Sequence, residues 1–229
     1  MINETIRKRK SIRKYDLTKL DDATLDKVRA KAESAMPLYP EIRYSTEIIN
    51  KTRGIFNVKA PHYLIFSSEK TEGYLENIGF IGQQLDLFFS ENGLGACWLG
   101  MAKPTETENT ELPYVIAIGF GKPAEPLHRD LAEFKRKSLE EISEGSDERL
   151  EAARLAPSGM NAQTWFFDAT LSKIHCYRKK VLLKFRNELS AIDMGIALCH
   201  IAQESDDFRF MKETYALQRK GHIYMGTVL

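Results

Sequence analysis

Two short stretches decide the fold of this chain: RKSIRKY at residues 9–15 and APSGMNAQTW at residues 156–165. In the first, Arg9, Ser11 and Arg13 alternate, so an extended backbone would present all three on one face. Two guanidinium groups beside a hydroxyl suit phosphate and sugar oxygens, because planar, charged donors bind phosphate strongly. The stretch therefore predicts an anion site. Residues 7–14 hold six basic residues, so a solvated face or a nuclear-targeting or nucleic-acid patch is the alternative interpretation.

The second stretch predicts a turn that follows a helix ending before Pro157. Gly159 would let the backbone approach a flat ring closely, because it has no side chain. Ser158 and Asn161 offer hydrogen-bond donors and acceptors. An ordinary helix-ending loop is the alternative interpretation.

The composition excludes several classes of protein. The 229 residues are 43% hydrophobic and 28% charged, which is typical of a soluble globular protein with a large core. A net charge of +1 provides no overall field for nucleic acid, so no nucleic-acid partner is expected. No apolar run approaches the roughly 18 residues of a membrane span, and the N-terminus lacks the apolar segment of a signal peptide.

The cysteines and histidines bear on location and on metal binding. Cys97, Cys176 and Cys199 are odd in number and widely spaced, which favours reduced thiols in a cytoplasm. The five histidines show no metal-ligand spacing, so no metal site is expected.

Local patterns predict an alternation of helices and strands. Asn3, Asp21 and Ser146 are expected helix caps, and apolar helices are expected around residues 78–89 and 192–202. Residues 38–58 are weakly periodic and are interpreted as a mobile excursion or lid. Strands are predicted at residues 62–66, 96–100, 114–120, 165–169, 173–178 and 223–228.

The two halves of the sequence, residues 1–144 and 145–229, resemble each other faintly. Each holds a helix that stops at a proline (Pro37, Pro157), then strands, then an apolar helix with a central glycine (Gly82, Gly195). The first half carries Arg9-x-Ser11-x-Arg13 and the second half carries Pro157-Ser158. We infer an intrachain pseudo-dimer in which one of two ancestral sites survives.

The two stretches together resemble the nitroreductase family of FMN enzymes. In that family an R-x-S-x-R segment holds the phosphate and ribityl side of FMN, and a P-S-x-x-N-x-Q-P-W turn from the other subunit closes the site. Thr164 stands where the family usually has proline, which puts the local backbone in doubt but not the contacts. The resemblance implies FMN contacts for Arg9, Lys10, Ser11, Arg13, Pro157, Ser158, Gly159, Asn161 and Gln163.

Two further segments extend the resemblance. GLGACWLG at residues 93–100 is similar to a family strand whose backbone points at the flavin N5 atom, which implies that role for Leu99 and Gly100. KRKSLEE at residues 135–141 is similar to the family's second phosphate contact, which implies Lys135, Arg136 or Lys137. A surface charge run is the alternative interpretation.

The resemblance implies an α+β fold with an antiparallel sheet core, surrounding helices and one FMN between the halves. It implies NAD(P)H-driven reduction of a small acceptor, such as a nitroaromatic or a quinone, by ping-pong hydride transfer, with no protein residue performing the chemistry. Arg13 would lie near the pyrimidine end of the ring, and substrate would stack on the ring beneath residues 38–58. The alternatives are another flavin chemistry, reductive dehalogenation or flavin breakdown to dimethylbenzimidazole, and a non-catalytic flavin-binding protein. A monomer and a homodimer are both compatible with this reading.

Overall fold

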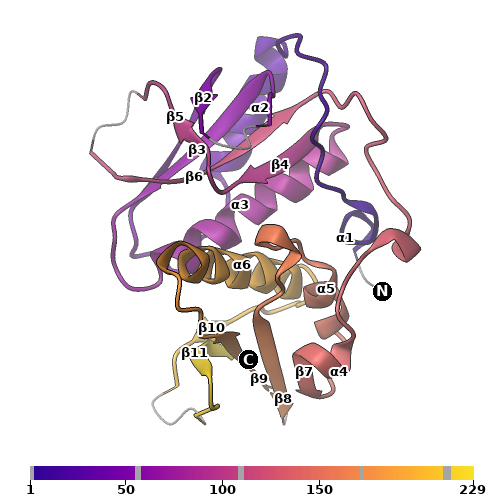
Figure 1. The fold of residues 1–229 in the computed structure, drawn as a ribbon, viewed down its shortest axis with the longest axis vertical. Helices are drawn as coiled ribbons and strands as arrows, with labels where there is room; N and C mark the ends of the chain where they lie inside the picture. Colours follow the sequence, from indigo (N-terminus) through magenta and orange to yellow (C-terminus); the bar gives the residue numbers. More distant parts are fainter. Residues whose placement is uncertain (1–2, 55–57, 108–110, 171–172, 214–217) are drawn as a thin grey trace.

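The computed structural model describes residues 3–54, 58–107, 111–170, 173–213 and 218–229 (Figure 1). Two β-sheets lie toward opposite ends of the long axis of the molecule, and two long helices, α3 (Tyr74–Glu91) and α6 (Lys184–Ala202), lie between them. The expected α+β fold with antiparallel sheets is confirmed. Within the described ranges, no helix combines the length and apolar character needed to cross a membrane.

The first sheet has the strand order β1–β3–β6–β4, and all neighbours are antiparallel. Its central strand β3 is buried along its whole length, which explains its continuous apolar run. Leu64 and Phe66 pack into the larger core around α3, whereas Tyr63 and Ile65 face a smaller core on the opposite side. The strands are β1 (Tyr44–Ile49), β3 (His62–Ser68), β4 (Gly95–Leu99) and β6 (Tyr114–Gly121).

The second sheet has the order β10–β11–β9–β8–β7, in which only the pair β7–β8 is parallel. Its buried residues Phe167, Ile174 and Cys176 belong to the same large core as α3 and α6. The strands are β7 (Ser143–Gly145), β8 (Trp165–Thr170), β9 (Lys173–Lys179), β10 (Phe210–Met211) and β11 (His222–Val228).

The same connection order occurs twice along the chain. Helix α2 (Asp22–Glu33) is followed by β1, β3, α3, β4 and β6, and helix α5 (Leu150–Leu155) is followed by β8, β9, α6, β10 and β11. The two sheets then place these strands in equivalent order, with β7 as an additional edge strand of the second sheet. A boundary between residues 144 and 145 falls inside β7.

Helices α3 and α6 cross at two glycines. A Cβ atom at Gly79 would overlap the carbonyl oxygen of Ile192, and a Cβ atom at Gly195 would overlap the carbonyl oxygen of Glu76. Ile192 and Glu76 each precede the facing glycine of their own helix by three residues, so the two contacts are reciprocal. Gly82, which the sequence comparison set beside Gly195 as the central glycine of its helix, lies in α3 but faces the ring of Trp98, and Gly79 is the glycine that faces α6.

The remaining elements are short. Asn3 caps α1 (Glu4–Lys8) and Asp21 caps α2, as expected. The cap expected at Ser146 is wrong, because α5 begins after Arg149 and residues 146–149 precede it. The other elements are β2 (Thr52–Arg53), which pairs with β5 (Lys103–Pro104), the 3-10 turns η1 (Leu131–Glu133) and η2 (Gly159–Asn161), and α4 (Leu139–Ile142).

The lid expected at residues 38–58 is not what the structure shows. Residues 44–49 form β1, which pairs with β3 along its whole length, and Thr52 and Arg53 form β2. All six side chains of β1 are half-buried, so the strand lacks the alternation that marks a typical edge strand. Residues 55–57 of this interval lie outside the described residues.

Candidate functional site

The N-terminal segment after α1 runs alongside β4, which is an edge strand of the first sheet. Ser11 bridges Ala96 of β4, and the Ile12 amide donates to the Ala96 carbonyl at 2.9 Å. The buried side chain of Ile12 packs directly against Gly95, which has no side chain to obstruct it. These contacts hold Ser11 and Arg13 at the edge of the sheet, where α6 and the turn after α5 approach.

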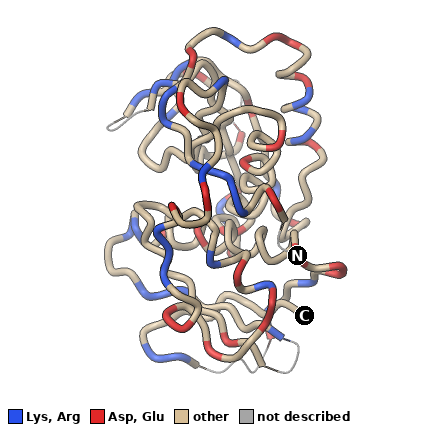
Figure 2. Tube along the Cα trace, turned by 90° about the vertical axis from the view of Figure 1, so that its right-hand side faces the viewer, with Lys and Arg blue, Asp and Glu red and all other residues tan. Residues whose placement is uncertain are grey.

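A cavity of about 440 Å³ lies beside this segment. Five basic side chains and one acidic side chain line it, so its field strongly favours an anion. Figure 2 shows that basic and acidic residues are otherwise interspersed over both parts of the molecule. The lining residues are Lys10, Ser11, Arg13, Arg129, Glu133, Lys135, Arg136, Pro157, Ser158, Met160 and Asn161.

The arginines at this cavity repel one another. Burial, together with Arg129 and Arg9, lowers the pKa of Arg136 to about 9. Burial and Arg9 likewise lower the pKa of Arg129 to about 10. Buried Nη1 of Arg9 and Nε of Arg136 have no hydrogen-bond partner among the described residues. Orphaned cationic donors are costly, and a multiply charged oxyanion in the cavity that Arg136 lines would offset the charge of the cluster.

A second cavity of about 190 Å³ adjoins the first and is mainly apolar. The two share Ser11, Arg13, Pro157, Ser158 and Met160, so they form one continuous site. The remaining lining residues are Cys97, Trp98, Gly100, Met101, Ile116, Gly159, Phe185, Leu189, Ile192, Asp193 and Ile196. An apolar compartment that adjoins a cationic one suits a ligand with an aromatic ring and a phosphate tail.

The turn over both cavities has an unusual backbone. Met160, Asn161 and Gln163 have φ of 53°, 55° and 47°, in the left-handed region that non-glycine residues rarely adopt. The Gly159 amide donates to Asp193 Oδ1 at 2.8 Å, and the Gln163 amide donates to Ser158 Oγ at 3.0 Å. These bonds fix a backbone that carries local strain, which is typical of a ligand-binding turn.

The basic segment at residues 135–137 is tied to the same turn. Arg136 Nη1 donates to Asn161 Oδ1 at 2.6 Å, and Asn161 Nδ2 donates to the Lys135 carbonyl at 2.7 Å. The Lys137 amide donates to Gln163 Oε1 at 2.8 Å. Asn161 and Gln163 thus hold the basic segment against the turn.

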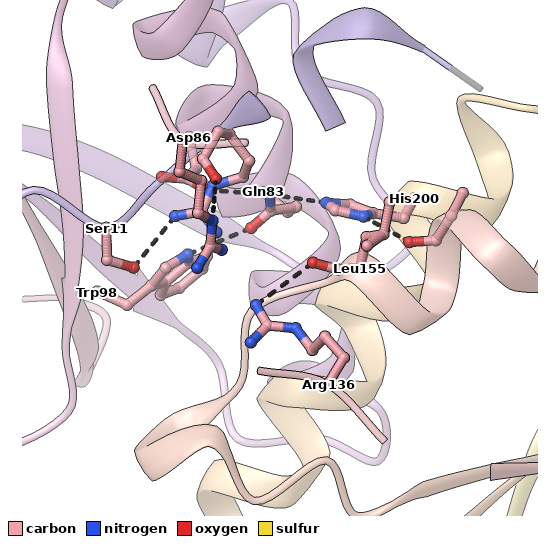
Figure 3. A network of polar contacts seen from close by, with 10 residues as sticks. Ser11, Gln83, Asp86, Trp98, Arg136, Leu155 and His200 are labelled. Carbon is pink, nitrogen blue, oxygen red and sulfur yellow. Dashed lines mark hydrogen bonds and ion pairs between the residues drawn. The ribbon is translucent and has the colours of Figure 1, made fainter. Parts of the chain in front are cut away.

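A buried polar network lies behind the site (Figure 3). Arg9 Nη2 donates to Ser11 Oγ at 3.1 Å, and Arg9 Nε lies 2.8 Å from Asp86 Oδ2. Gln83 Nε2 donates to Asp86 and contacts His200 Nε2, both at 3.0 Å. The network therefore connects Ser11, which lines the site, to the centre of the α3–α6 core.

The protonation of this network follows from its contacts. Burial lowers the pKa of His200 to about 3, so its ring is neutral. Its Nδ1 faces the carbonyl of Ala152 at 2.9 Å and must donate, which leaves Nε2 to accept from Gln83. Gln83 Oε1 then accepts from the Trp98 indole at 3.3 Å. This chain fixes the orientation of Trp98 in the wall of the apolar cavity.

The structure brings most of the predicted site residues together. Ten of them line the two cavities: Lys10, Ser11, Arg13, Gly100, Lys135, Arg136, Pro157, Ser158, Gly159 and Asn161. Arg9, Leu99, Lys137 and Gln163 do not line them; Arg9 and Gln163 are bonded just behind the lining, and Leu99 is buried in the smaller core. None of the described residues of 38–58 lines either cavity.

Sequence reasoning missed the contribution of α6 and Arg129. Leu189, Ile192, Asp193 and Ile196 are spaced as one face of a helix, and the apolar helix expected around residues 192–202 was not assigned to the site. A buried acid within that apolar face was the one signal that could have marked it. Among the described residues, no group of three or more His, Cys, Asp or Glu side chains is placed to hold a metal ion.

Comparisons with known proteins bear on the family and the fold of this chain. Residues 1–205 match the model of the family described as "Putative TM nitroreductase". A Thermotoga maritima protein described as a "putative nitroreductase" superposes with a TM-score of 0.66 at 21% identity, covering 98% of this chain and 90% of that one. The comparison with curated proteins gave no match.

Two shorter structures cover less of the chain. An "FMN-dependent Nitroreductase" of Clostridium difficile R20291 has a TM-score of 0.45 at 18% identity, covering 57% of this chain and 93% of that one. A "Putative NADH dehydrogenase/NAD(P)H nitroreductase" of Bacteroides thetaiotaomicron has a TM-score of 0.48 at 16% identity, with coverages of 61% and 94%.

Proposed function

Because this chain belongs to the nitroreductase family whose model matches residues 1–205, we propose that it binds FMN and carries electrons from NAD(P)H to a small acceptor. The acceptor class is a nitroaromatic or a quinone. When bound, FMN supplies the two-electron chemistry, because the cofactor rather than the protein performs the redox step in flavoenzymes.

The cationic cavity is the observation that carries this proposal. Arg13, Arg129 and Arg136 face a space with few acidic side chains, and the Nε donor of Arg136 has no partner among the described residues. This donor set fits a terminal phosphate of charge near −2 better than it fits a neutral ligand. Lys10, Lys135 and Ser11 add further donors for the phosphate and the sugar chain.

The apolar cavity fits the flavin ring. Trp98, Ile192 and Ile196 provide apolar walls, and the turn at Pro157–Gly159 lies against the same space. Gly100 lines it at the end of β4, where the family resemblance places a backbone contact to the ring. Leu99, Lys137, Gln163 and Arg9 would act from behind the lining, by fixing the residues that touch the ligand.

We also propose that the site lies between two halves of a single chain. Ser11 and Arg13 come from residues 1–144, whereas the Pro157 turn and α6 come from residues 145–229. The repeated strand order and the reciprocal Gly79–Gly195 crossing support an origin by fusion of two related halves. The three cysteines are free buried thiols, which fits the expected cytoplasmic location.

The cofactor and the electron donor can be tested together. Heat release and chromatography of the bound flavin should identify FMN, and anaerobic titration with NADH or NADPH should bleach its absorbance. Recovery of FAD, or failure to retain any flavin after reconstitution, contradicts the proposal. A fully flavinated protein that neither nucleotide reduces is instead a flavin-binding protein without this activity.

A further inference from the structure

Asp193 is a buried acid in the wall of the apolar cavity. Its side chain is 4% exposed, and it lies on α6 among Leu189, Ile192 and Ile196, which line the same cavity. Its Oδ1 accepts a hydrogen bond from the Gly159 amide at 2.8 Å. Asp193 therefore holds the turn in place, but a carboxyl group is an expensive acceptor for an apolar site.

The other half of the molecule performs the same task with a neutral group. Asn77 precedes Gly79 by two residues, as Asp193 precedes Gly195. Asn77 Oδ1 accepts from the Tyr39 amide at 3.0 Å, and Tyr39 follows Pro37 by two residues, as Gly159 follows Pro157. An amide oxygen thus suffices to hold the equivalent turn. The acid at position 193 adds a group that can bind or release a proton.

Among the residues that the structure describes, no cationic side chain contacts Asp193 directly. Arg13 and Cys97 are the other titratable side chains that line its cavity. Arg154 and Arg178 lie on elements packed against α6, but Arg154 binds Glu151 and Arg178 binds Asn187 and Ser190. The other buried or half-buried charged or imidazole side chains on the packed elements are Glu76 and Asp86 of α3, Asp168 of β8 and His175 of β9.

Burial is the main influence on this carboxyl. It raises the pKa of Asp193 to about 7, against the opposing effect of the Gly159 hydrogen bond. A flat ring that enters the cavity excludes water from the same group, and further desolvation favours the neutral acid. Filling the cavity must therefore increase the proton affinity of Asp193.

We propose that Asp193 binds a proton when a flavin ring fills the apolar cavity, so that loading of the site is linked to proton uptake. This inference rests on the proposed FMN function. The neutral acid keeps its acceptor oxygen for Gly159 and adds no negative charge beside an electron-rich ring. Asp193 is thus a positioning residue, and the protonation state of its carboxyl group depends on whether the cavity is filled.

The linkage has a definite sign. Below about pH 7 the carboxyl is protonated in both the empty and the loaded protein, so Asp193 adds no pH dependence there. Above pH 7 the empty protein loses the proton and the loaded protein retains it. The dissociation constant for FMN should then rise by up to about tenfold per pH unit until the loaded protein also releases the proton.

The test is calorimetry of FMN binding at pH 8 in two buffers with different ionisation heats. Asp193→Asn keeps an acceptor for Gly159 and cannot titrate. Wild type should take up about half a proton or more beyond the uptake of Asp193→Asn, and at pH 9 the variant should bind FMN on the order of tenfold more tightly. Proton uptake at Arg136 occurs in both proteins and cancels in the difference.

Asn77→Asp is the matched control, because it places the acid in the other half and away from the cavity lining. It should take up as many protons on FMN binding as wild type does. Equal proton uptake and equal pH dependence of FMN binding in wild type and Asp193→Asn overturn the inference. If the variant does not fold, a wild type that takes up no protons on binding FMN overturns it. Absence of FMN binding at every pH overturns the proposed function instead, and this inference with it.

Discussion

The Nε atom of Arg9 lies 2.8 Å from Oδ2 of Asp86, and the two side chains are only 1% and 2% exposed. The arginine that opens the Arg9-x-Ser11-x-Arg13 motif is therefore first the counter-ion of a buried acid on α3. Its Nη2 holds Ser11, and its Nη1 has no hydrogen-bond partner among the described residues. Arg9 consequently joins the candidate site to the core, so its loss should affect the fold before it affects the ligand.

Arg9→Ala should destabilise the flavin-free protein by about 3–5 kcal/mol, because it leaves the Asp86 carboxylate buried without a cation. Urea unfolding followed by circular dichroism measures this change. The exposed neighbour Lys14 provides the control, and Lys14→Ala should leave the unfolding midpoint unchanged. Equal midpoints for wild type and Arg9→Ala would show that the ion pair does not support the fold.

Arg13→Ala should weaken FMN binding about ten- to a hundredfold, the loss expected for one charge-assisted hydrogen bond. Arg13 lines both cavities and is exposed, so its removal should not perturb folding. Quenching of FMN fluorescence on titration gives the affinity. Lys14→Ala again serves as the control, since Lys14 lines neither cavity. A similar loss of FMN affinity in both variants would show that the basic residues act only through their overall charge.

Arg136→Met should reduce the response of the flavin-free protein to inorganic phosphate. Burial and the neighbouring arginines lower the pKa of Arg136 to about 9, so at neutral pH its charge opposes folding, and that opposition fades as pH rises through 9. Phosphate should raise the melting temperature of wild type by binding the cluster, with about 2.7 kcal/mol gained at a hundred times its dissociation constant. The variant should melt higher without phosphate and gain less from it. An equal rise in melting temperature with phosphate in both proteins would show that the anion does not bind at Arg136.

The sequence indicates which residue types the candidate site contains, but it does not reveal the ion pair between Arg9 and Asp86. Lys10, Ser11 and Arg13 belong to one local motif and Arg136 belongs to another, and all four line the cationic cavity. Arg9 carries the same local signal, yet it turns inward to Asp86, 77 positions further along the chain. A partner so distant in sequence leaves no trace in the spacing of the motif.

Two structural elements were misread for different physical reasons. Residues 44–49 form an edge strand whose side chains are all half-buried, so neither alternation nor a continuous apolar run marks it. On α6 the apolar spacing was recognised, but a helix packed on two sides shows the same pattern whether one side meets the core or a ligand. Only the placement of Asp193 beside Gly159 separates these cases.

Gly79→Ala and Gly195→Ala should each destabilise the protein strongly, because a Cβ atom at either position overlaps a backbone carbonyl of the facing helix. Separation of α3 and α6 would also open the candidate site. Gly93→Ala is the control, since Gly93 has φ of +74° but open space around it, and it should cost only about 1–2 kcal/mol of conformational strain. Chemical denaturation compares the three variants, and a neutral Gly195→Ala would contradict the close crossing.

One FMN should bind to each chain, because each half supplies what the other lacks. Ser11 and Arg13 form one side of the candidate site, and the Pro157 turn of the same chain forms another side of it. In the other half, the turn after Pro37 carries Tyr39 at the position where the Pro157 turn has Gly159. The ring of Tyr39 contacts the ring of Phe210 edge-on, so a bulky side chain stands where the Pro157 turn leaves room. Calibrated flavin absorbance against amino-acid analysis gives the stoichiometry, and light scattering gives the mass of the flavinated species. A ratio near two would mean that both halves retain a site. A ratio near one-half would mean that two chains share one, and the intrachain arrangement would then be wrong even if FMN is the ligand.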